Sequence, residues 1–173
     1  RRTLLAACDV LVESSAAHER EHSLEVQLPF LQCVLKDFKI VPIALGQPTK
    51  ESCRKLAKAL AALVPQRKVL IIASTDLSHY PSYEDAQKAD KAMLTAVEGL
   101  DPDAILAADK EWMGRDLPNL KCTMCGLWPA VTLAMVAEEL GSCSAEVLKY
   151  ANSGDVPAGS RSGVVGYGAV AVC

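Results

Sequence analysis

The stretch Lys68-Val-Leu-Ile-Ile-Ala73, continued by Ser74-Thr-Asp-Leu-Ser-His-Tyr80, decides the fold. Its first part is an almost continuous apolar run rich in branched side chains, which is typical of a strand buried on both faces of a parallel sheet. Its second part is polar and begins where that strand ends. Ligands in α/β sheets bind at the carboxyl ends of strands. The sequence therefore predicts an α/β domain with a candidate site in residues 74–80.

Strands and helices alternate along the chain outside this stretch. Thr49 can cap a helix over residues 50–63, and Ser82 with Asp85 resembles the capping box of a helix over residues 83–100. The other expected elements are a strand at 39–45, helices starting at 101 and 126, and closing strands at 145–150 and 163–172. This alternation predicts a layered α/β fold with a mostly parallel or mixed central sheet flanked by helices.

The composition is that of one domain spanning residues 1–173. Half of the residues are apolar, 23% are charged, and the formal net charge is −3. No basic run indicates nucleic acid, and no segment reaches the ~20 apolar residues of a membrane helix. Seven cysteines, an odd number, favour reduced thiols and a cytoplasmic location. Because no initiator methionine precedes Arg1, we expect the chain to be cut from a longer protein.

Asp76 and His79 are the first candidate catalytic residues. They follow the apolar run directly, and their spacing allows the carboxylate to orient or charge the imidazole. Histidine is the natural proton carrier near neutral pH. The alternative is a loop with an Asp cap and a hydrogen-bonded histidine.

A second candidate is the Cys122-Thr-Met-Cys125 segment before the predicted helix at 126–141. A thiolate at a helix N-terminus can ligate a metal or attack an electrophile, because the backbone N–H groups favour its charge. One C-x-x-C without a second pair makes a closed structural zinc site a poor interpretation. The alternative is a pair of small core residues.

Residues 18–22, His-Glu-Arg-Glu-His, match the H-E-x-x-H pattern of zinc proteases. On a helix, His18 and His22 would share one face and Glu19 would be the general base. The surrounding sequence is polar, whereas protease helices of this kind are buried. Apolar spacing over residues 17–36 predicts a helix that Pro29 kinks or interrupts.

The loop at residues 150–160, Tyr-Ala-Asn-Ser-Gly-Asp-Val-Pro-Ala-Gly-Ser, follows an expected strand. Polar loops in this position often line clefts. A plain turn is the equally weighted alternative.

The order of these segments resembles the Memo-like family, including the microbial AmmeMemoRadiSam system protein B group. His18-x-x-Glu-His-Ser-Leu-Glu-Val-Gln-Leu-Pro-Phe-Leu31 is similar to the signature of that family. Residues 74–79, 123–126, 150–155 and 164–169 resemble its later motifs, in the same order. The resemblance covers essentially the whole chain and makes it the larger, C-terminal part of such a protein.

The resemblance implies the fold of the class III extradiol dioxygenases and a metal held by two histidines and a cysteine. The cysteine matches Cys125, and both histidines are expected upstream of residue 1. Asp76 and His79 match polar residues of the cleft near the metal, and His22 with Glu21 matches another polar signature there. The implied metal is iron or copper, with zinc as a further option.

Three functions remain open from the sequence. The first is metal-dependent redox or dioxygenase-like activity in the full-length protein, with this chain inactive by itself. The second is a binding or scaffold protein that uses the same cleft for a small molecule or peptide. The resemblance adds radical-SAM and Ammecr-like proteins as partners, and an exposed sheet edge would favour homo-oligomers. The third is the H-E-x-x-H zinc protease.

Overall fold

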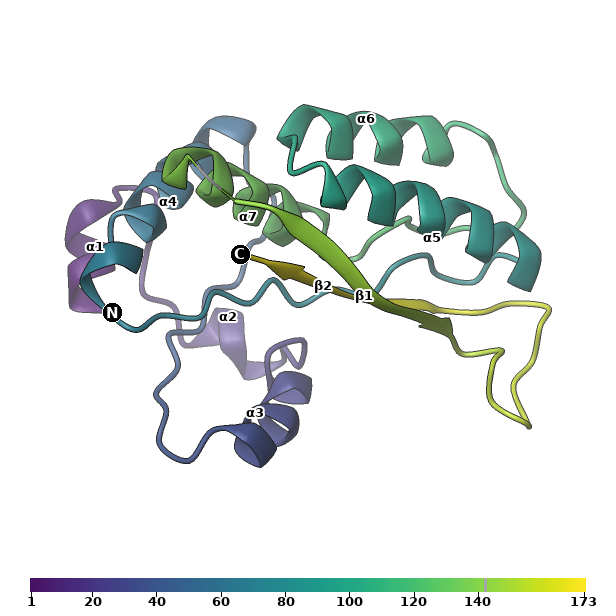
Figure 1. Cartoon of the computed structure of the whole chain (residues 1–173), viewed down its shortest axis with the longest axis horizontal. Coiled ribbons are helices and arrows are strands. Elements are labelled where there is room, and N and C mark those ends of the chain that lie inside the picture. The colour runs from purple at the N-terminus through teal and green to yellow at the C-terminus, as the bar shows by residue number, and fades with distance from the viewer. Residues whose placement is uncertain (142) are drawn as a thin grey trace.

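The computed structural model describes residues 1–141 and 143–173, which form an α/β structure of helices packed on a two-stranded sheet (Figure 1). The helices are α1 (Arg2–Ala7), α2 (Ala16–Glu19), α3 (Leu28–Val34), α4 (Lys50–Ala61), α5 (Tyr83–Glu98), α6 (Pro102–Met113) and α7 (Leu127–Leu140). Short 3-10 turns lie at η1 (Glu25–Gln27) and η2 (Val64–Gln66), and the strands are β1 (Ala145–Asn152) and β2 (Gly166–Val172).

The sheet is an antiparallel hairpin of β1 and β2. Its register runs from Ala145 opposite Val172 to Asn152 opposite Gly166, with an irregularity between Val147 and Lys149. Both closing strands predicted from the sequence are confirmed. In place of the predicted mostly parallel or mixed sheet, the described residues form these two antiparallel strands.

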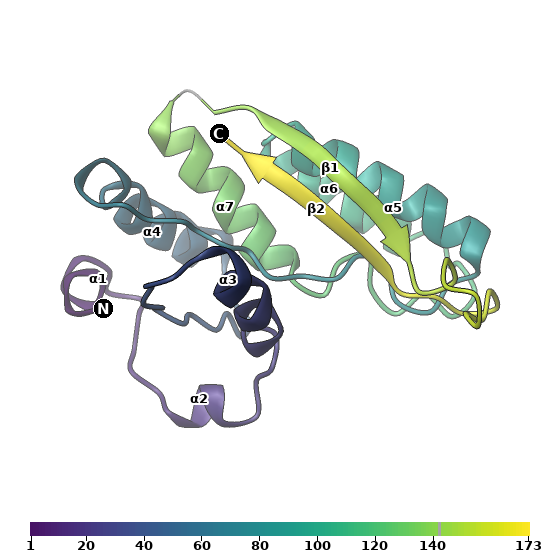
Figure 2. The same ribbon diagram turned by 60° about the horizontal axis from the view of Figure 1, so that its bottom comes forward.

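Helices α4 to α7 and the hairpin enclose the main core. In Figure 2, α4 and α7 lie on one side of the hairpin, and α5 and α6 lie behind it and on the other side. Helix α5 packs against both strands and α6, while α7 packs against α4. Met93, Ile105, Val131 and Met135 are fully buried there. Each such side chain contributes about 1.5–3 kcal/mol on burial. No described helix is long and apolar enough to cross a membrane.

The helix starts follow the capping residues in the sequence. The Thr49 side chain accepts from the Ser52 backbone N–H at 3.1 Å, and Ser52 Oγ accepts from the Thr49 N–H at 3.0 Å. Ser82 Oγ accepts from the Asp85 N–H at 3.2 Å. Asp101 caps α6 through two backbone N–H groups. The predicted helix starts are confirmed, because a cap needs only its own next few residues. The predicted capping box at Ser82 is only half formed, since the Asp85 carboxylate accepts from Ser82 Oγ instead of the Ser82 N–H.

The strands predicted at residues 39–45 and 68–73 are wrong. Both segments lack strand pairing in the described part of the chain. Leu70 is 71% exposed, and Val69 and Ile72 are also exposed, where burial on both faces was expected. A strand forms only against a neighbour that accepts and donates its backbone hydrogen bonds, and no described segment does so here.

Residues 16–34 form two helices instead of one. α2 ends at Glu19, well before Pro29, and α3 carries Pro29 in its first turn. The helix is interrupted, but Pro29 begins the second helix instead of kinking or ending the first. Both views place α2 and α3 apart from α5 and α6 (Figures 1 and 2). On α3, Phe30 and Val34 are 73% and 77% exposed.

Candidate metal centre

The candidate centre is built on the segment from Ser74 to Tyr80. Its backbone pairs with the start of β2, since Leu77 N–H donates to Gly166 O at 2.9 Å and Tyr80 N–H donates to Val164 O at 2.7 Å. On its other side lies the turn before α7, where the His79 N–H donates to the Cys122 carbonyl at 3.1 Å. The segment is thus fixed between the hairpin and that turn.

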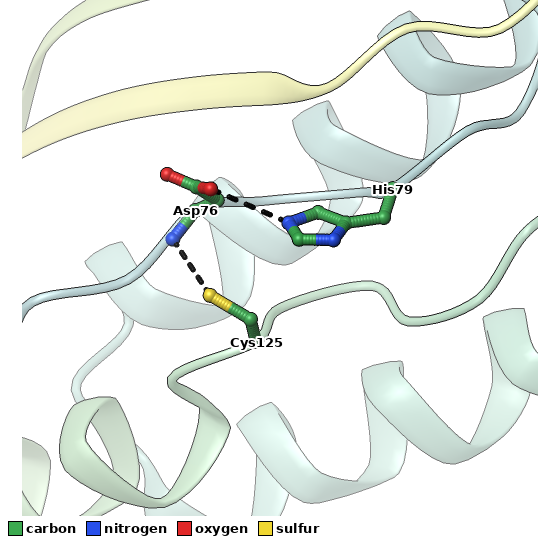
Figure 3. Close-up of side chains that lie close together, drawn as sticks. All are labelled: Asp76, His79 and Cys125. Atoms are coloured by element: carbon green, nitrogen blue, oxygen red, sulfur yellow. Dashed lines mark hydrogen bonds and ion pairs between the residues drawn. The ribbon is translucent and has the colours of Figure 1, made fainter. Parts of the chain in front are cut away.

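Asp76, His79 and Cys125 converge at this place (Figure 3). One ligand atom from each of the three lies within 4.8 Å of the others. His79 Nε2 and Asp76 Oδ2 are 3.4 Å apart. The first two residues come from the segment after residue 73 and the third from the turn before α7, so the fold joins positions far apart in sequence.

Backbone hydrogen bonds hold the sulfur of Cys125. The Asp76 N–H donates to Cys125 Sγ at 3.1 Å, and the Cys125 N–H donates to the Asp76 carbonyl at 3.3 Å. Thr75 Oγ1 accepts from the Gly126 N–H at 2.7 Å and lies 3.8 Å from Sγ. These contacts fix the direction of the sulfur without using the Asp76 carboxylate, which stays available.

The imidazole of His79 carries a buried nitrogen without a hydrogen bond. Nε2 has no hydrogen-bond partner among the described residues, and it lies 3.4 Å from Asp76 Oδ2. An unpaired buried nitrogen is costly, and such groups are usually satisfied. A metal ion bound to that nitrogen would satisfy it, and oxygen, nitrogen and sulfur donors together suit iron, copper or zinc. The three residues therefore fit a metal of this kind.

The signature segment at residues 18–31 reaches this region through two polar residues that the sequence did not single out. Gln27 Nε2 donates to Ser74 Oγ at 2.9 Å, and Ser74 Oγ donates to the Ser23 carbonyl at 2.6 Å. The only sequence signal was their place inside motifs that resemble the family. These bonds attach the segment two residues before Asp76.

Glu21 and His22, predicted as catalytic residues, are both exposed and lie outside the group of three. Glu21 accepts from the Ser23 N–H at 2.6 Å, and this bond lowers the pKa of its carboxyl below the ordinary value. Any catalytic role for the pair stays a prediction.

The zinc-protease interpretation is wrong. α2 ends at Glu19, so His18 and His22 do not share the face of one helix. A metal-binding pair four residues apart needs that shared face. Arg20 already has a non-helical backbone, with φ −121° and ψ 8°.

Cys122 does not join Cys125 as a second thiolate. It is partly buried, and burial, followed by the neighbouring Cys125 and the carboxylates of Asp109 and Asp76, raises its pKa to about 11. Both cysteines are free, and only Cys125 belongs to the group of three. The alternative of a small core residue therefore fits Cys122.

The loop after β1 is held by hydrogen bonds within itself and by hydrogen bonds to Tyr83 at the start of α5. Asp155 accepts from the Tyr83 hydroxyl at 2.6 Å and from the Asn152 N–H at 2.7 Å. The bond from Tyr83 is the main cause of the lowered pKa of Asp155. These bonds fix the turn at Asp155 against α5, and a cleft-lining role for residues 150–160 stays a prediction.

Comparison with known proteins gives one consistent result. A family model described as "Memo-like protein" matches residues 1–171. A MEMO1 family protein of Methanobrevibacter smithii is 39% identical over 167 residues, which are 95% of this chain and 56% of the relative. MEMO1 family protein MK0963 of Methanopyrus kandleri is 35% identical over 170 residues, or 96% and 57%. The chain thus spans just over half the length of these relatives.

Proposed function

Because this chain belongs to the Memo-like protein family, we propose that it binds a metal ion, with Asp76, His79 and Cys125 as the ligands that this chain supplies. The observation that carries the proposal is the convergence of three different donor atoms within 4.8 Å, one of them a buried nitrogen without a hydrogen bond. Three protein ligands leave one position open, as in catalytic metal sites.

The metal we propose is iron or copper, with zinc as the third option. Thiolate and imidazole donors select these metals over magnesium or calcium. When bound, iron or copper supplies one-electron redox chemistry toward a small substrate. Cys125 is exposed and Asp76 is half exposed, so a substrate can approach from solvent.

For the whole protein we propose metal-dependent redox activity on the layered fold of the class III extradiol dioxygenases. There, two upstream histidines would share the metal with Cys125. His79 would then carry a proton, and the Asp76 carboxylate, 3.4 Å away, would orient its ring. Metal binding by this chain alone and activity of a longer chain are therefore separate questions.

Zinc titration calorimetry and elemental analysis of this chain test the metal proposal directly. We expect about one metal ion per chain, and Cys125→Ala and His79→Ala should each weaken binding by at least about 100-fold, beyond the usual effect of an outer partner. Cys33→Ala, which removes an exposed cysteine on α3, is the matched control and should bind like the wild type. Unchanged metal binding in Cys125→Ala would contradict the assignment of Cys125 as a ligand.

The same titration on a chain extended upstream separates the two ligand sets. If the extended chain alone binds metal, the ligands are Cys125 with upstream histidines, and His79 keeps the proton-carrying role. Turnover of catechol-type or other small substrates by the extended chain, lost in Cys125→Ala, would support the redox proposal. Metal binding without turnover of any such substrate would count against it.

A binding or scaffold function is the second candidate, because apolar side chains are exposed on two segments. These are Phe30 and Val34 on α3, and Val69, Leu70 and Ile72 on the extended run. A peptide, or radical-SAM and Ammecr-like proteins, would cover such side chains. Pull-down with these partners should then depend on Phe30 and not on Cys125. Dependence on Cys125 alone would contradict this function.

A further inference from the structure

Asp90 is a fully buried carboxylate that the proposed centre does not use. It lies on α5 and faces the segment that carries Asp76 and His79. Its Oδ1 accepts from the Ser78 backbone N–H at 2.8 Å, and its Oδ2 accepts from the Tyr150 hydroxyl at 2.8 Å. Ser78, which lies between the two candidate ligands in sequence, is itself fully buried.

The backbone N–H groups of residues 76–80 donate in an order that a regular strand cannot give. In a strand, successive N–H groups point alternately to opposite edges. Here Asp76 and His79 both donate toward the turn before α7, to Cys125 Sγ and Cys122 O. Leu77 and Tyr80 both donate toward the start of β2.

Ser78 is thus one extra residue inserted into the alternation, as in a β-bulge. The insertion has a direct effect on the candidate ligands. Residues three apart on a regular strand point to opposite faces, so Asp76 and His79 could not meet. The extra residue brings His79 onto the side of Asp76, where their side chains come within 3.4 Å.

The extra residue leaves the Ser78 backbone N–H without a strand partner, and the Asp90 carboxylate accepts the hydrogen bond from this N–H. A buried N–H that loses its only acceptor costs about 1–3 kcal/mol. Room for the carboxylate comes from Gly166 at the start of β2, because a methyl group on its Cα would overlap Oδ2 of Asp90. The helix, the hairpin and the site segment therefore meet at this one carboxylate.

Burial raises the pKa of Asp90, against the opposing effect of the hydrogen bonds from Ser78 and Tyr150. A buried carboxylate costs stability compared with an apolar side chain of similar size. Packing alone therefore does not explain an aspartate on this face of α5, whose neighbours there include Ala86, Ala89 and Met93.

We propose that Asp90 is a positioning residue of the metal centre, which holds the bulge at Ser78 and so places Asp76 and His79 on the same side, facing Cys125. This rests on the proposed metal function. It assigns to Asp90 a role in the geometry of the ligands, since its hydrogen bonds come from Ser78 and Tyr150 and from none of the three.

Two conservative variants separate position from charge. Asp90→Asn keeps an oxygen acceptor at the same place and loses the charge, whereas Asp90→Glu keeps the charge and moves the acceptor by one methylene. We expect Asp90→Glu to weaken zinc binding about tenfold or more and to change the d–d absorption spectrum of the cobalt(II) form. Asp90→Asn should stay close to wild type in both. Tyr150→Phe removes the other hydrogen bond to the same carboxylate, so it should lower the melting temperature and leave zinc affinity unchanged.

Wild-type affinity and an unchanged cobalt spectrum in Asp90→Glu would overturn the proposal. Weakening in Asp90→Asn with wild-type affinity in Asp90→Glu would also overturn it, because charge and not position would then matter. Equal weakening in both variants would overturn it as well, because keeping the acceptor in place would then make no difference. If Asp90→Glu gives no cooperative melting, Asp90→Ser replaces it, with the same expectation and the same overturning result. Its shorter side chain withdraws the acceptor without adding bulk.

Amide hydrogen exchange gives a readout that does not need the metal. In Asp90→Glu, the amides of residues 76–79 should exchange about tenfold faster or more, while Asp90→Asn should keep their protection. If the wild-type chain binds no zinc, the metal proposal fails, and this measurement alone decides the role of Asp90. Unchanged amide exchange of residues 76–79 in Asp90→Glu would contradict the role of Asp90 in holding the bulge.

Discussion

Two hydrogen bonds join Asp76 and Cys125, and neither of them uses the Asp76 side chain. The Asp76 N–H donates to Cys125 Sγ at 3.1 Å, and the Cys125 N–H donates back to the Asp76 carbonyl at 3.3 Å. The position of the sulfur is therefore set by the backbone of a residue whose carboxylate is itself a candidate ligand. Changes to that carboxylate can be tested without moving the sulfur.

Asp76→Asn should weaken zinc binding by about tenfold or more and change the free energy of unfolding by less than about 0.5 kcal/mol. The carboxylate is half exposed, and the backbone bonds to Cys125 stay intact. Calorimetric titration and thermal melting measure the two effects. Asp37→Asn, at an exposed position, is the control. A loss of stability that matches the loss of zinc affinity would show that the carboxylate supports the fold and not only metal binding.

Gly126→Ala should destabilise the chain by about 1–3 kcal/mol, because overpacking forces the neighbouring backbone to move. A Cβ there would lie 2.5 Å from the Ser74 carbonyl oxygen and 2.6 Å from Thr75 Cβ. The displaced turn carries Cys125, so metal affinity should fall as well. Urea unfolding measures the change, and Gly46→Ala, with nothing within 4 Å, is the control. Equal stability of both variants would show that the contact relaxes freely.

Cys122 should react slowly with iodoacetamide. With its pKa raised to about 11, roughly a thousandth of its thiol is ionised at pH 8, and the thiolate is the reacting species. Peptide mapping over time should show the exposed Cys33 modified at least about tenfold faster. Similar rates for the two cysteines would show that Cys122 is more accessible or more ionised than the structure indicates.

The stability of the chain should carry a pH dependence that comes from Asp90. Its folded pKa is raised by burial, so the folded state binds its proton more tightly than the unfolded state. The stabilisation of the folded state by the proton on Asp90 is fully present below the ordinary aspartate pKa of about 3.9. It is lost as pH rises through the pKa of Asp90 in the folded state. Between these two pKa values, the unfolding free energy of the wild type should fall relative to that of Asp90→Asn as pH rises, because asparagine does not titrate. A constant difference would contradict the raised pKa.

The sequence predicted the helices better than the strands for a physical reason. The caps at Thr49, Ser82 and Asp101 act within one turn, so their signals are local. The run after Lys68 has strand composition, but strand formation depends on a neighbour that no local pattern can supply. The two strands that do form, β1 and β2, are close in sequence and pair with each other.

The candidate site was predicted in part. Asp76, His79 and Cys125 were singled out, and the structure brings their side chains together. Their approach could not be derived from spacing, because it depends on the extra residue at Ser78. Asp90 was missed, although a visible signal existed. It is an acidic residue among the apolar positions of α5, where a solvated charge would be out of place.

The exposed run after Lys68 has a consequence for solubility. Val69, Leu70 and Ile72 belong to a short stretch of strongly β-forming residues without proline, and their side chains face water. Such stretches start cross-β aggregation when their backbone is unpaired. Arg67 and Lys68 directly precede the run, and two like charges at that position repel a second copy aligned in register. We therefore expect these two cations to oppose fibril formation, and low ionic strength, which leaves their repulsion unscreened, to favour the dispersed chain.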